Sequence, residues 1–371
     1  MKDTTILITG GHATPAIAVV EELRKTHPSW KVIWVGRKYA LEGSRAQSGE
    51  YQLISTMDIL FINLTTGRWQ RSFSLYTIPS LLKFPIGILQ SFLILKKYNP
   101  ELVVSFGGYI ALPIALAAYC LGIPLLTHEQ THKPGLANAI IGAFAKKICV
   151  TFPETLSFVP PKKAVVTGLP IRSEILKPSL HPSFPAPEEN IPIVYMTGGS
   201  TGAQSLNEKL FTIIPTLVKD MIVIHQTGDA SFEKAKKIQK ELGVGKSRYI
   251  IAPFFQTRDV AWIYHHAAVV VGRSGANTVF EVSALNKRAI FIPLPWAGGD
   301  EQTKNAHWLA SSGSAIVIQQ DTLTIDAFKK AMTELLQQVE KISQLPTIVP
   351  NKGAVNVVKE IETCLPFYAK H

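Results

Sequence analysis

The feature of this sequence that most constrains its fold is an alternation of short apolar runs with helical segments in both halves of the chain. Runs typical of strands lie at 6–9, 31–35, 102–105, 123–127 and 148–151, and then at 193–196, 221–225, 248–251, 268–271, 289–292 and 315–318. Segments typical of helices lie between them, among them 15–25, 111–121, 204–210, 277–285 and 302–312. Strands that alternate with helices form parallel sheets with helices on both faces. The sequence therefore predicts an α/β fold, and its 371 residues predict two doubly wound, Rossmann-like domains.

A proline-rich stretch marks the boundary between the two halves. Six prolines lie between residues 170 and 192, a composition typical of a linker. We therefore expect an N-terminal domain at 1–165, a linker at 166–190, a C-terminal domain at 191–350, and a helix at 351–371 that packs back on the N-terminal domain. The two domains would face a central cleft, because ligands of doubly wound sheets bind outside the carboxyl ends of the strands.

The charge distribution indicates an anionic partner for the N-terminal half. Of a net charge of +11, residues 1–165 hold 17 Lys and Arg against 9 Asp and Glu. Such an excess favours nucleic acid or an anionic membrane as the partner, but no nucleic-acid motif accompanies it, and an ordinary solvated surface remains an alternative.

The three cysteines, Cys120, Cys149 and Cys364, lack the spacing of metal ligands. No secretory leader precedes the first apolar run, so we expect a cytoplasmic protein without a metal.

One segment has the composition of a membrane-surface element. Residues 68–97 are rich in large apolar side chains and include five basic residues, Arg68, Arg71, Lys83, Lys96 and Lys97. This combination suits a position on anionic lipid, and a core helix with charged ends is the alternative. Residues 102–127 carry no charge, but prolines and a glycine pair interrupt them, so they predict strand, turn, helix and strand instead of a membrane span.

Three glycine-rich turns follow predicted strands. The most informative is Gly-Gly-Ser-Thr-Gly-Ala at 198–203, and two similar turns lie at 9–12 and 105–109. A glycine turn that opens a helix lets a phosphate approach free backbone N–H groups, and the helix dipole adds partial positive charge. Each turn predicts phosphate binding, although a turn that only connects strand to helix has the same composition.

Polar residues near these turns are candidates for the chemistry of the site. His12 follows the first turn and could act as a general base near neutral pH, while Glu129 follows a neighbouring strand of the same predicted sheet. Glu281 is expected one turn inside a helix, where its carboxylate could accept both hydroxyls of a ribose. Structural hydrogen bonds for His12 and solvent exposure for Glu281 are the alternatives. Gln302 and Asn305 would share the first turn of a late helix and could bind sugar hydroxyls.

Taken in order, these motifs resemble the GT-B glycosyltransferases, and most closely the MurG family. The residues that carry the resemblance extend over nearly the whole chain: Thr9–His12 with Pro15, Ser105–Tyr109, His128–Gln130, Pro134–Asn138, Thr167–Arg172, Gly198–Ala203, His225–Gly228, Pro253–Phe255, Arg273–Ala276 through Glu281, and Asp300–Thr303 with Asn305. The resemblance implies an inverting hexosyltransferase that moves N-acetylglucosamine from UDP-N-acetylglucosamine to the 4-hydroxyl of the muramoyl sugar of lipid I. The product would be lipid II for peptidoglycan synthesis, formed at the cytoplasmic face of the membrane by a peripheral enzyme. The sequence shows no metal-ligand cluster, so we expect no metal or other cofactor to be essential.

The resemblance also implies residue roles. The C-terminal domain would bind the donor: the diphosphate at Ser200 and the surrounding Gly199 and Gly202 with Arg172, the uracil at Phe255, the ribose at Glu281, a phosphate near Ser274, Gly275, Ala276 and Thr278, and the sugar at Glu301, Gln302 and Asn305. Thr131 would also contact the donor sugar, and Asn138 would be a further donor-binding residue. The N-terminal domain would bind the acceptor diphosphate near Gly10, Gly11, Gly107, Gly108 and Tyr109. His12 would be the general base, with Glu129 as the second candidate.

The sequence departs from the family pattern at two places. Leu7 and Ile8 stand where the family usually has two glycines, and Thr131 stands where it usually has asparagine. The first change touches the acceptor side and the second a sugar contact. Three alternatives stay open at this stage: a GT-B transferase with another lipid-linked acceptor, a UDP-sugar epimerase, and a non-catalytic UDP-sugar binder.

Overall fold

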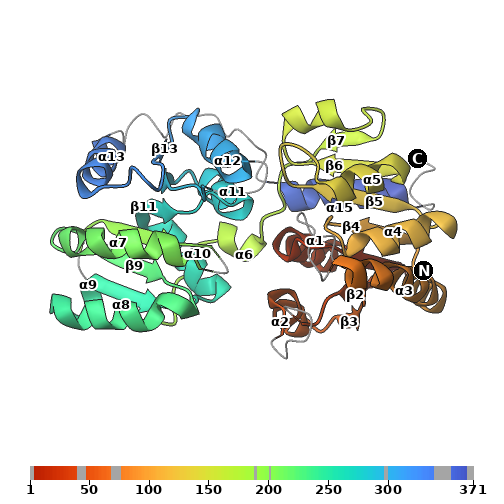
Figure 1. Ribbon diagram of the computed structural model, residues 1–371, viewed down its shortest axis with the longest axis horizontal. Helices are drawn as coiled ribbons and strands as arrows, with labels where there is room; N and C mark the ends of the chain where they lie inside the picture. Colours follow the sequence, from red (N-terminus) through yellow and green to blue (C-terminus); the bar gives the residue numbers. More distant parts are fainter. Residues whose placement is uncertain are drawn as a thin grey trace. The chain divides into compact units, whose positions relative to one another are not determined.

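The chain divides into two compact units, each built on one parallel sheet. The computed structural model describes residues 4–39, 47–67, 77–187, 190–199, 202–295, 300–337 and 352–365 (Figure 1). The first unit comprises Met1–Arg172 together with Lys352–His371, and the second comprises Ser173–Asn351. The prediction of two doubly wound α/β units is confirmed.

The sheet of the first unit has seven parallel strands in the order β3-β2-β1-β4-β5-β6-β7. Their bounds are β1 Thr5–Thr9, β2 Lys31–Gly36, β3 Leu60–Asn63, β4 Leu102–Ser105, β5 Leu125–Glu129, β6 Lys147–Val150 and β7 Ala164–Val166. Parallel strands that are covered on both faces read as continuous apolar runs. Leu7 and Ile8 show this directly: both are fully buried in β1, and they belong to core clusters on opposite faces of the sheet. The first departure from the family pattern, at Leu7 and Ile8, is therefore part of the core strand.

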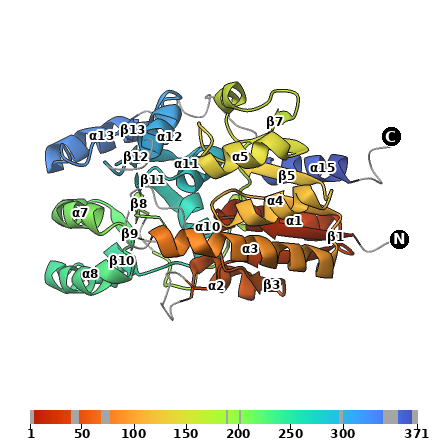
Figure 2. The ribbon, with the colours of Figure 1, turned by 45° about the vertical axis from the view of Figure 1, so that its right-hand side comes forward.

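Helices cover both faces of this sheet. The first unit contains α1 Ala13–Thr26, α2 Gly49–Ser55, α3 Thr77–Tyr98, α4 Ala111–Cys120, α5 Leu136–Phe144, the 3-10 helix Pro153–Phe158, and α15 Gly353–Cys364. Helices α1 and α15 share one core cluster with Ile8, while α4 and α5 share the opposite cluster with Leu7. Helix α3 packs beside α4 (Figure 2). None of the helices within the described residues is long and apolar enough to cross a bilayer.

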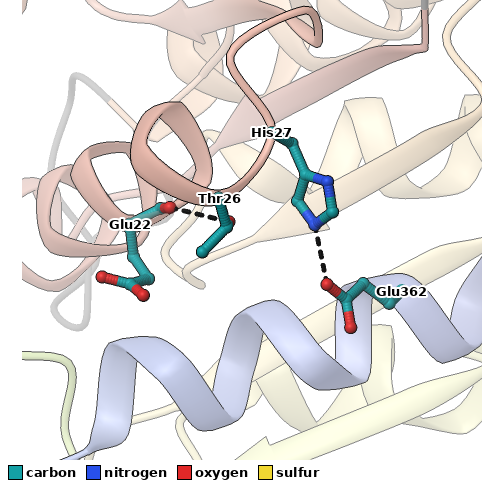
Figure 3. A network of polar contacts seen from close by, with 4 residues as sticks. All are labelled: Glu22, Thr26, His27 and Glu362. Carbon is teal, nitrogen blue, oxygen red and sulfur yellow. Dashed lines mark hydrogen bonds and ion pairs between the residues drawn. The ribbon is translucent and has the colours of Figure 1, made fainter.

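Helix α15 comes from the far end of the sequence and completes the core of the first unit. Val357 and Ile361 of this helix are fully buried against α1 and the sheet. Its first residue, Gly353, approaches the chain so closely that a Cβ there would lie 2.2 Å from the carbonyl oxygen of Leu169. At its other end, His27 Nε2 lies 2.7 Å from Glu362 Oε1 (Figure 3). The contact joins the end of α1 to the end of α15.

The second unit has six parallel strands in the order β10-β9-β8-β11-β12-β13. The strands are β8 Ile193–Thr197, β9 Ile222–Gln226, β10 Tyr249–Ala252, β11 Ala267–Gly272, β12 Arg288–Phe291 and β13 Ala315–Val317. The helices are α6 Ser173–Leu176, α7 Gln204–Leu217, α8 Asp229–Leu242, α9 Gly245–Arg248, α10 Thr257–His266, α11 Ala276–Ala284, α12 Glu301–Ala310 and α13 Ile325–Gln337. The main core cluster includes Val194 and Met196 of β8 with residues of α7 and α13. Tyr195, between them, meets the ring of Tyr264 in α10 at 5.6 Å, so α10 lies on the other face.

The proline-rich stretch is divided between the two units. Thr167 accepts a hydrogen bond from the side chain of Asn356 in α15, 3.1 Å away, and so belongs to the first unit. Ser183 donates to both carboxylate oxygens of Asp259 in α10, at 2.6 and 2.7 Å, and so packs on the second unit. Residues that precede and follow Arg172 are therefore each fixed to a different sheet.

Candidate active site

Each sheet has one point where the strand order reverses, and the predicted glycine turns lie at these points. In the first unit the reversal falls between β1 and β4, and in the second between β8 and β11. The carboxyl ends of these four strands lead into 10–12, 106–110, 198–199 and 273–275, and Gly202 and Ala203 precede α7. Ligands of open parallel sheets bind at such switch points. Each unit therefore carries one candidate site in the place that its topology favours.

The two glycine turns of the first unit pack directly against each other. Gly11 N–H donates to the carbonyl oxygen of Gly107 over 2.8 Å. Gly10 has a φ of +147°, and a Cβ there would lie 2.7 Å from the backbone nitrogen of Phe106. Only glycine permits this approach. Next to the turns, the Arg37 guanidinium lies over the ring of Tyr109, 5.6 Å from its centroid. Arg37 follows β2 and had no predicted role.

His12 lies at the N-terminal end of α1, at the switch point, with one ring nitrogen occupied. Its Nδ1 lies 2.9 Å from the side-chain Nε2 of Gln130, which follows β5. Burial lowers the pKa of His12 below its usual value, and the nearby Glu129 opposes this shift. The imidazole is therefore neutral near pH 7, which is the form that can accept a proton.

Glu129 has hydrogen-bond partners for both carboxylate oxygens. Oε1 accepts from the backbone N–H of Thr131 at 2.8 Å, and the Thr131 hydroxyl lies 2.7 Å from it. Oε2 accepts from the side-chain amide of Asn138 at 2.8 Å and from the N–H of Gly135 at 3.3 Å. The Thr131 hydroxyl, where the family usually has asparagine, thus supports the carboxylate. These contacts make Glu129 an anchor for the loop that follows β5.

In the second unit, Gln226 connects two of the predicted donor-binding segments. Its Nε2 donates to the carbonyl oxygen of Gly199 at 3.1 Å, and its Oε1 accepts from the backbone N–H of Phe255 at 3.1 Å. Gln226 is the last residue of β9 and is almost fully buried. The predicted site residue Ser200 lies outside the described residues. Gly202 also lies close to the end of β9, because a Cβ there would come within 3.0 Å of Gly228.

Glu281 is held by a tyrosine from the neighbouring helix. Helix α11 begins at Ala276 after Gly275, so Glu281 lies just beyond its first turn, close to Thr278, and both side chains are buried. The phenolic hydroxyl of Tyr264 in α10 donates to Glu281 Oε2 over 2.9 Å. Burial raises the pKa of Tyr264 well above its usual value, and the carboxylate raises it further. The phenol is therefore a permanent donor that fixes the carboxylate.

The turn after β11 is tied to the start of α12. The Ser274 hydroxyl donates to the carbonyl oxygen of Gln302 at 2.7 Å, and the side-chain amide of Asn305 donates to the carbonyl oxygen of Ser274 at 3.2 Å. Gln302 Oε1 accepts from the N–H of Leu294 at 3.0 Å. Asn305 is fully buried, whereas Glu301 and Gln302 are half-buried in the first turn of α12. The structure thus brings together Ser274, Gln302 and Asn305.

Arg172 is the last residue of the first unit, so the structure groups it with Thr131 and Asn138 on that unit and not with the other predicted donor residues. Three further residues had no predicted role: Gln130, Gln226 and Tyr264. Gln130 and Gln226 belong to two motifs that carry the family resemblance, His128–Gln130 and His225–Gly228. Those motifs are the sequence feature from which a role for the two residues could have been predicted. Nothing in the sequence points to Tyr264.

Two parallel doubly wound units, each with glycine turns at its switch point, have the architecture of the GT-B fold. The chain matches the glycosyltransferase family 28 N-terminal domain over residues 8–150 and the glycosyltransferase family 28 C-terminal domain over residues 193–361. The crystal structure of Acinetobacter baumannii MurG aligns with a TM-score of 0.68 and 28% identity, covering 97% of this chain and 99% of that one.

Two curated relatives carry the name UDP-N-acetylglucosamine--N-acetylmuramyl-(pentapeptide) pyrophosphoryl-undecaprenol N-acetylglucosamine transferase. The relative from Treponema denticola is 33% identical and covers 88% of this chain and 86% of its own length. The relative from Nitratidesulfovibrio vulgaris is 31% identical, and the match covers 93% of this chain and 91% of the relative's own length. The chain belongs to glycosyltransferase family 28, and within it to the MurG family.

Proposed function

We propose that this protein transfers N-acetylglucosamine from UDP-N-acetylglucosamine to the 4-hydroxyl of the muramoyl sugar of lipid I, with inversion, and so forms lipid II for peptidoglycan synthesis. The observation that carries the proposal is the match, over about nine-tenths of the chain, to relatives that bear the name of this transferase. The polar residues at the two switch points support it, because they supply the groups that such a transfer requires.

The second unit would bind the donor. The glycine turn after β8 leads into α7, and the turn after β11 leads into α11, so both present helix N-termini suited to a diphosphate. Glu281, fixed by Tyr264, would accept the ribose hydroxyls. The uracil would meet the backbone at Phe255, and the sugar would meet Glu301 and Gln302. Arg172 would contribute positive charge to the diphosphate.

The first unit would bind the acceptor and supply the base. The turns at Gly10–Gly11 and Gly107–Gly108, with Tyr109, would face the acceptor diphosphate. His12 would take the proton of the attacking hydroxyl, because it is kept neutral by burial. Glu129 is the weaker candidate, since both of its oxygens already accept hydrogen bonds from the loop that follows it. Backbone amides and cationic groups would stabilise the departing UDP.

An apolar surface of the first unit would contact the inner face of the cytoplasmic membrane. Ile86, Leu89 and Leu93 of α3 are each at least half exposed, and their spacing places them on one side of the helix. Helices α3, α4 and α5 are successive neighbours (Figure 2), and α4 and α5 add exposed Tyr119, Leu136 and Ile140. Lys96 and Lys97 end α3 and would meet anionic headgroups. Arg68 and Arg71 lie outside the described residues.

The decisive experiment is product analysis with UDP-N-acetylglucosamine and a short-chain lipid I analogue. We expect release of UDP only when the analogue is present, together with a disaccharide product in β configuration. UDP release that depends instead on a different lipid-linked sugar would assign another acceptor. Interconversion of UDP-sugars without acceptor would assign an epimerase, and tight donor binding without turnover would assign a binding protein.

A further inference from the structure

The side chain of Gln130 reaches His12 across 118 positions of sequence. Its Nε2 lies 2.9 Å from Nδ1 of His12, and its Oε1 is buried without a hydrogen-bond partner among the described residues. Because Gln130 occupies Nδ1, Nε2 is the ring nitrogen that is left for a substrate. Proton transfer would therefore take place at Nε2.

The orientation of the Gln130 amide decides whether Nε2 can accept a proton. A neutral imidazole has one N–H and one lone pair. If the amide NH₂ of Gln130 donates to Nδ1, the ring proton must be on Nε2, and Nε2 has no lone pair to offer. If the amide oxygen faces Nδ1 instead, it accepts the Nδ1–H, and Nε2 carries the lone pair. Both orientations place groups of nearly equal size in the same space, and they differ by half a turn of the amide.

Proton uptake by His12 favours the second orientation. An imidazolium ion donates from both nitrogens, so an amide NH₂ facing Nδ1 would oppose one donor to another. The partnerless Oε1 of Gln130 is the acceptor that the same side chain can supply by rotating. We infer that Gln130 is a positioning residue for the transfer: with its amide oxygen on Nδ1–H it keeps Nε2 of His12 free as the base and stabilises the imidazolium that forms. This inference rests on the proposed function, in which His12 is the base.

The other ionisable groups near His12 do not provide this acceptor. Glu129 acts on His12 by its charge, but its oxygens are engaged by Thr131, Gly135 and Asn138. His128 is buried, and its Nε2 lies 3.3 Å from the carbonyl oxygen of Gly168, to which it donates. Burial lowers the pKa of His128 to about 4, so it stays neutral. Within the described residues, Gln130 is the hydrogen-bond partner of Nδ1.

The test compares Gln130→Met and Gln130→Glu with the wild-type protein in the lipid I analogue assay across pH. Gln130→Met keeps the length of the side chain but replaces the amide by a thioether, which is only a weak acceptor. It should lower kcat at least about tenfold, which is part of the 10²–10⁴-fold effect of losing a general base. The KM for UDP-N-acetylglucosamine should change less than about twofold. Gln130→Glu supplies an acceptor with a negative charge, so it should be more active than Gln130→Met at high pH. The negative charge should also raise the pKa of His12, which moves the acid limb of the pH–rate profile up by roughly one pH unit. Gln52→Glu, on the exposed side of α2, adds the same charge elsewhere on this unit and should leave the pH profile unchanged.

Each other outcome overturns the inference in a distinct way. A Gln130→Met variant with wild-type kcat and pH profile, together with an inactive but folded His12→Ala, would show that Gln130 does not position His12 and that His12 is still the base. An acid limb that does not move in Gln130→Glu has the same meaning, and this near-isosteric variant serves if Gln130→Met does not fold. Normal turnover in His12→Ala would show that His12 is not the general base, and the inference about Gln130 would then be wrong as well.

Discussion

Tyr264 in α10 donates its phenolic hydrogen to Oε2 of Glu281 in α11, and the two oxygens lie 2.9 Å apart. The contact fixes a buried carboxylate at the place where a nucleotide ribose is proposed to bind. A carboxylate that is already oriented loses little side-chain entropy when a ligand arrives. The affinity of the donor should therefore depend on both residues.

We expect Glu281→Ala to weaken UDP binding by roughly 1.5–3 kcal/mol, because one charged hydrogen-bond acceptor is lost. Tyr264→Phe keeps the ring and should have a smaller effect of the same sign. Isothermal titration with UDP measures both. Tyr249→Phe is the matched control, since it removes a buried hydroxyl of the same unit that contacts His225. Unchanged affinity in a folded Glu281→Ala variant would remove Glu281 from the ribose site.

His12→Ala should lower turnover by about 10²–10⁴-fold, as expected for loss of a general base. UDP affinity should hardly change, because the donor-binding residues other than Arg172, Thr131 and Asn138 lie on the other unit. Steady-state rates with the lipid I analogue, normalised to folded protein, measure the effect. If His12 had only a structural role, the variant would be less stable but nearly normal in turnover per folded molecule.

Glu129→Gln should reduce stability more than turnover. Its amide nitrogen would face donors from Thr131 or Asn138, which leaves a buried donor without a partner at a cost of about 1–3 kcal/mol. Thermal unfolding and the same rate assay separate the two effects. A folded but inactive Glu129→Gln, together with an active His12→Ala, transfers the role of base to Glu129.

Replacement of Leu89 and Leu93 by Gln should reduce binding to anionic vesicles at least about tenfold, because each exposed leucine would bury apolar area in the lipid. Flotation with vesicles that contain anionic lipid measures it. Leu180→Gln is the control, since Leu180 is also exposed but belongs to the second unit. Replacement of Lys96 and Lys97 by Gln should weaken binding to anionic vesicles further, by about 1 kcal/mol for each charge removed. Wild-type protein that ignores such vesicles contradicts the membrane proposal.

Glu50 should make stability depend on pH. Burial raises its pKa to about 7, although the Trp34 indole N–H donates to it. A raised pKa means that the folded state binds more protons than the unfolded state, so stability should fall as pH rises from about 4.5 to about 7. Glu50→Gln should remove this part of the slope, which denaturant midpoints of the two proteins across that range would reveal. Parallel curves for wild type and Glu50→Gln contradict the prediction.

The central strands could be predicted because they are buried on both faces and so read as apolar runs. Strands β3 and β7 were missed because they lack this burial. β3 is an edge strand with half-exposed residues, and β7 has only three residues, none of them fully buried. Glycine turns and charged side chains also stand out in a sequence. The partners Gln130, Gln226 and Tyr264 do not, because the fold alone brings them to His12, Gly199 and Glu281 from other strands and helices.

Helix α15 gives the order of synthesis a consequence for folding. Residues that complete the core around β1 and α1 are made more than 300 positions after β1 itself. Domains usually fold as they emerge from the ribosome, but here the core on the α1 side of the first sheet stays incomplete until the second unit has been translated. The nascent first unit therefore lacks the apolar cover that Val357 and Ile361 give this part of the core, and exposed apolar surface of this kind favours aggregation until it is buried.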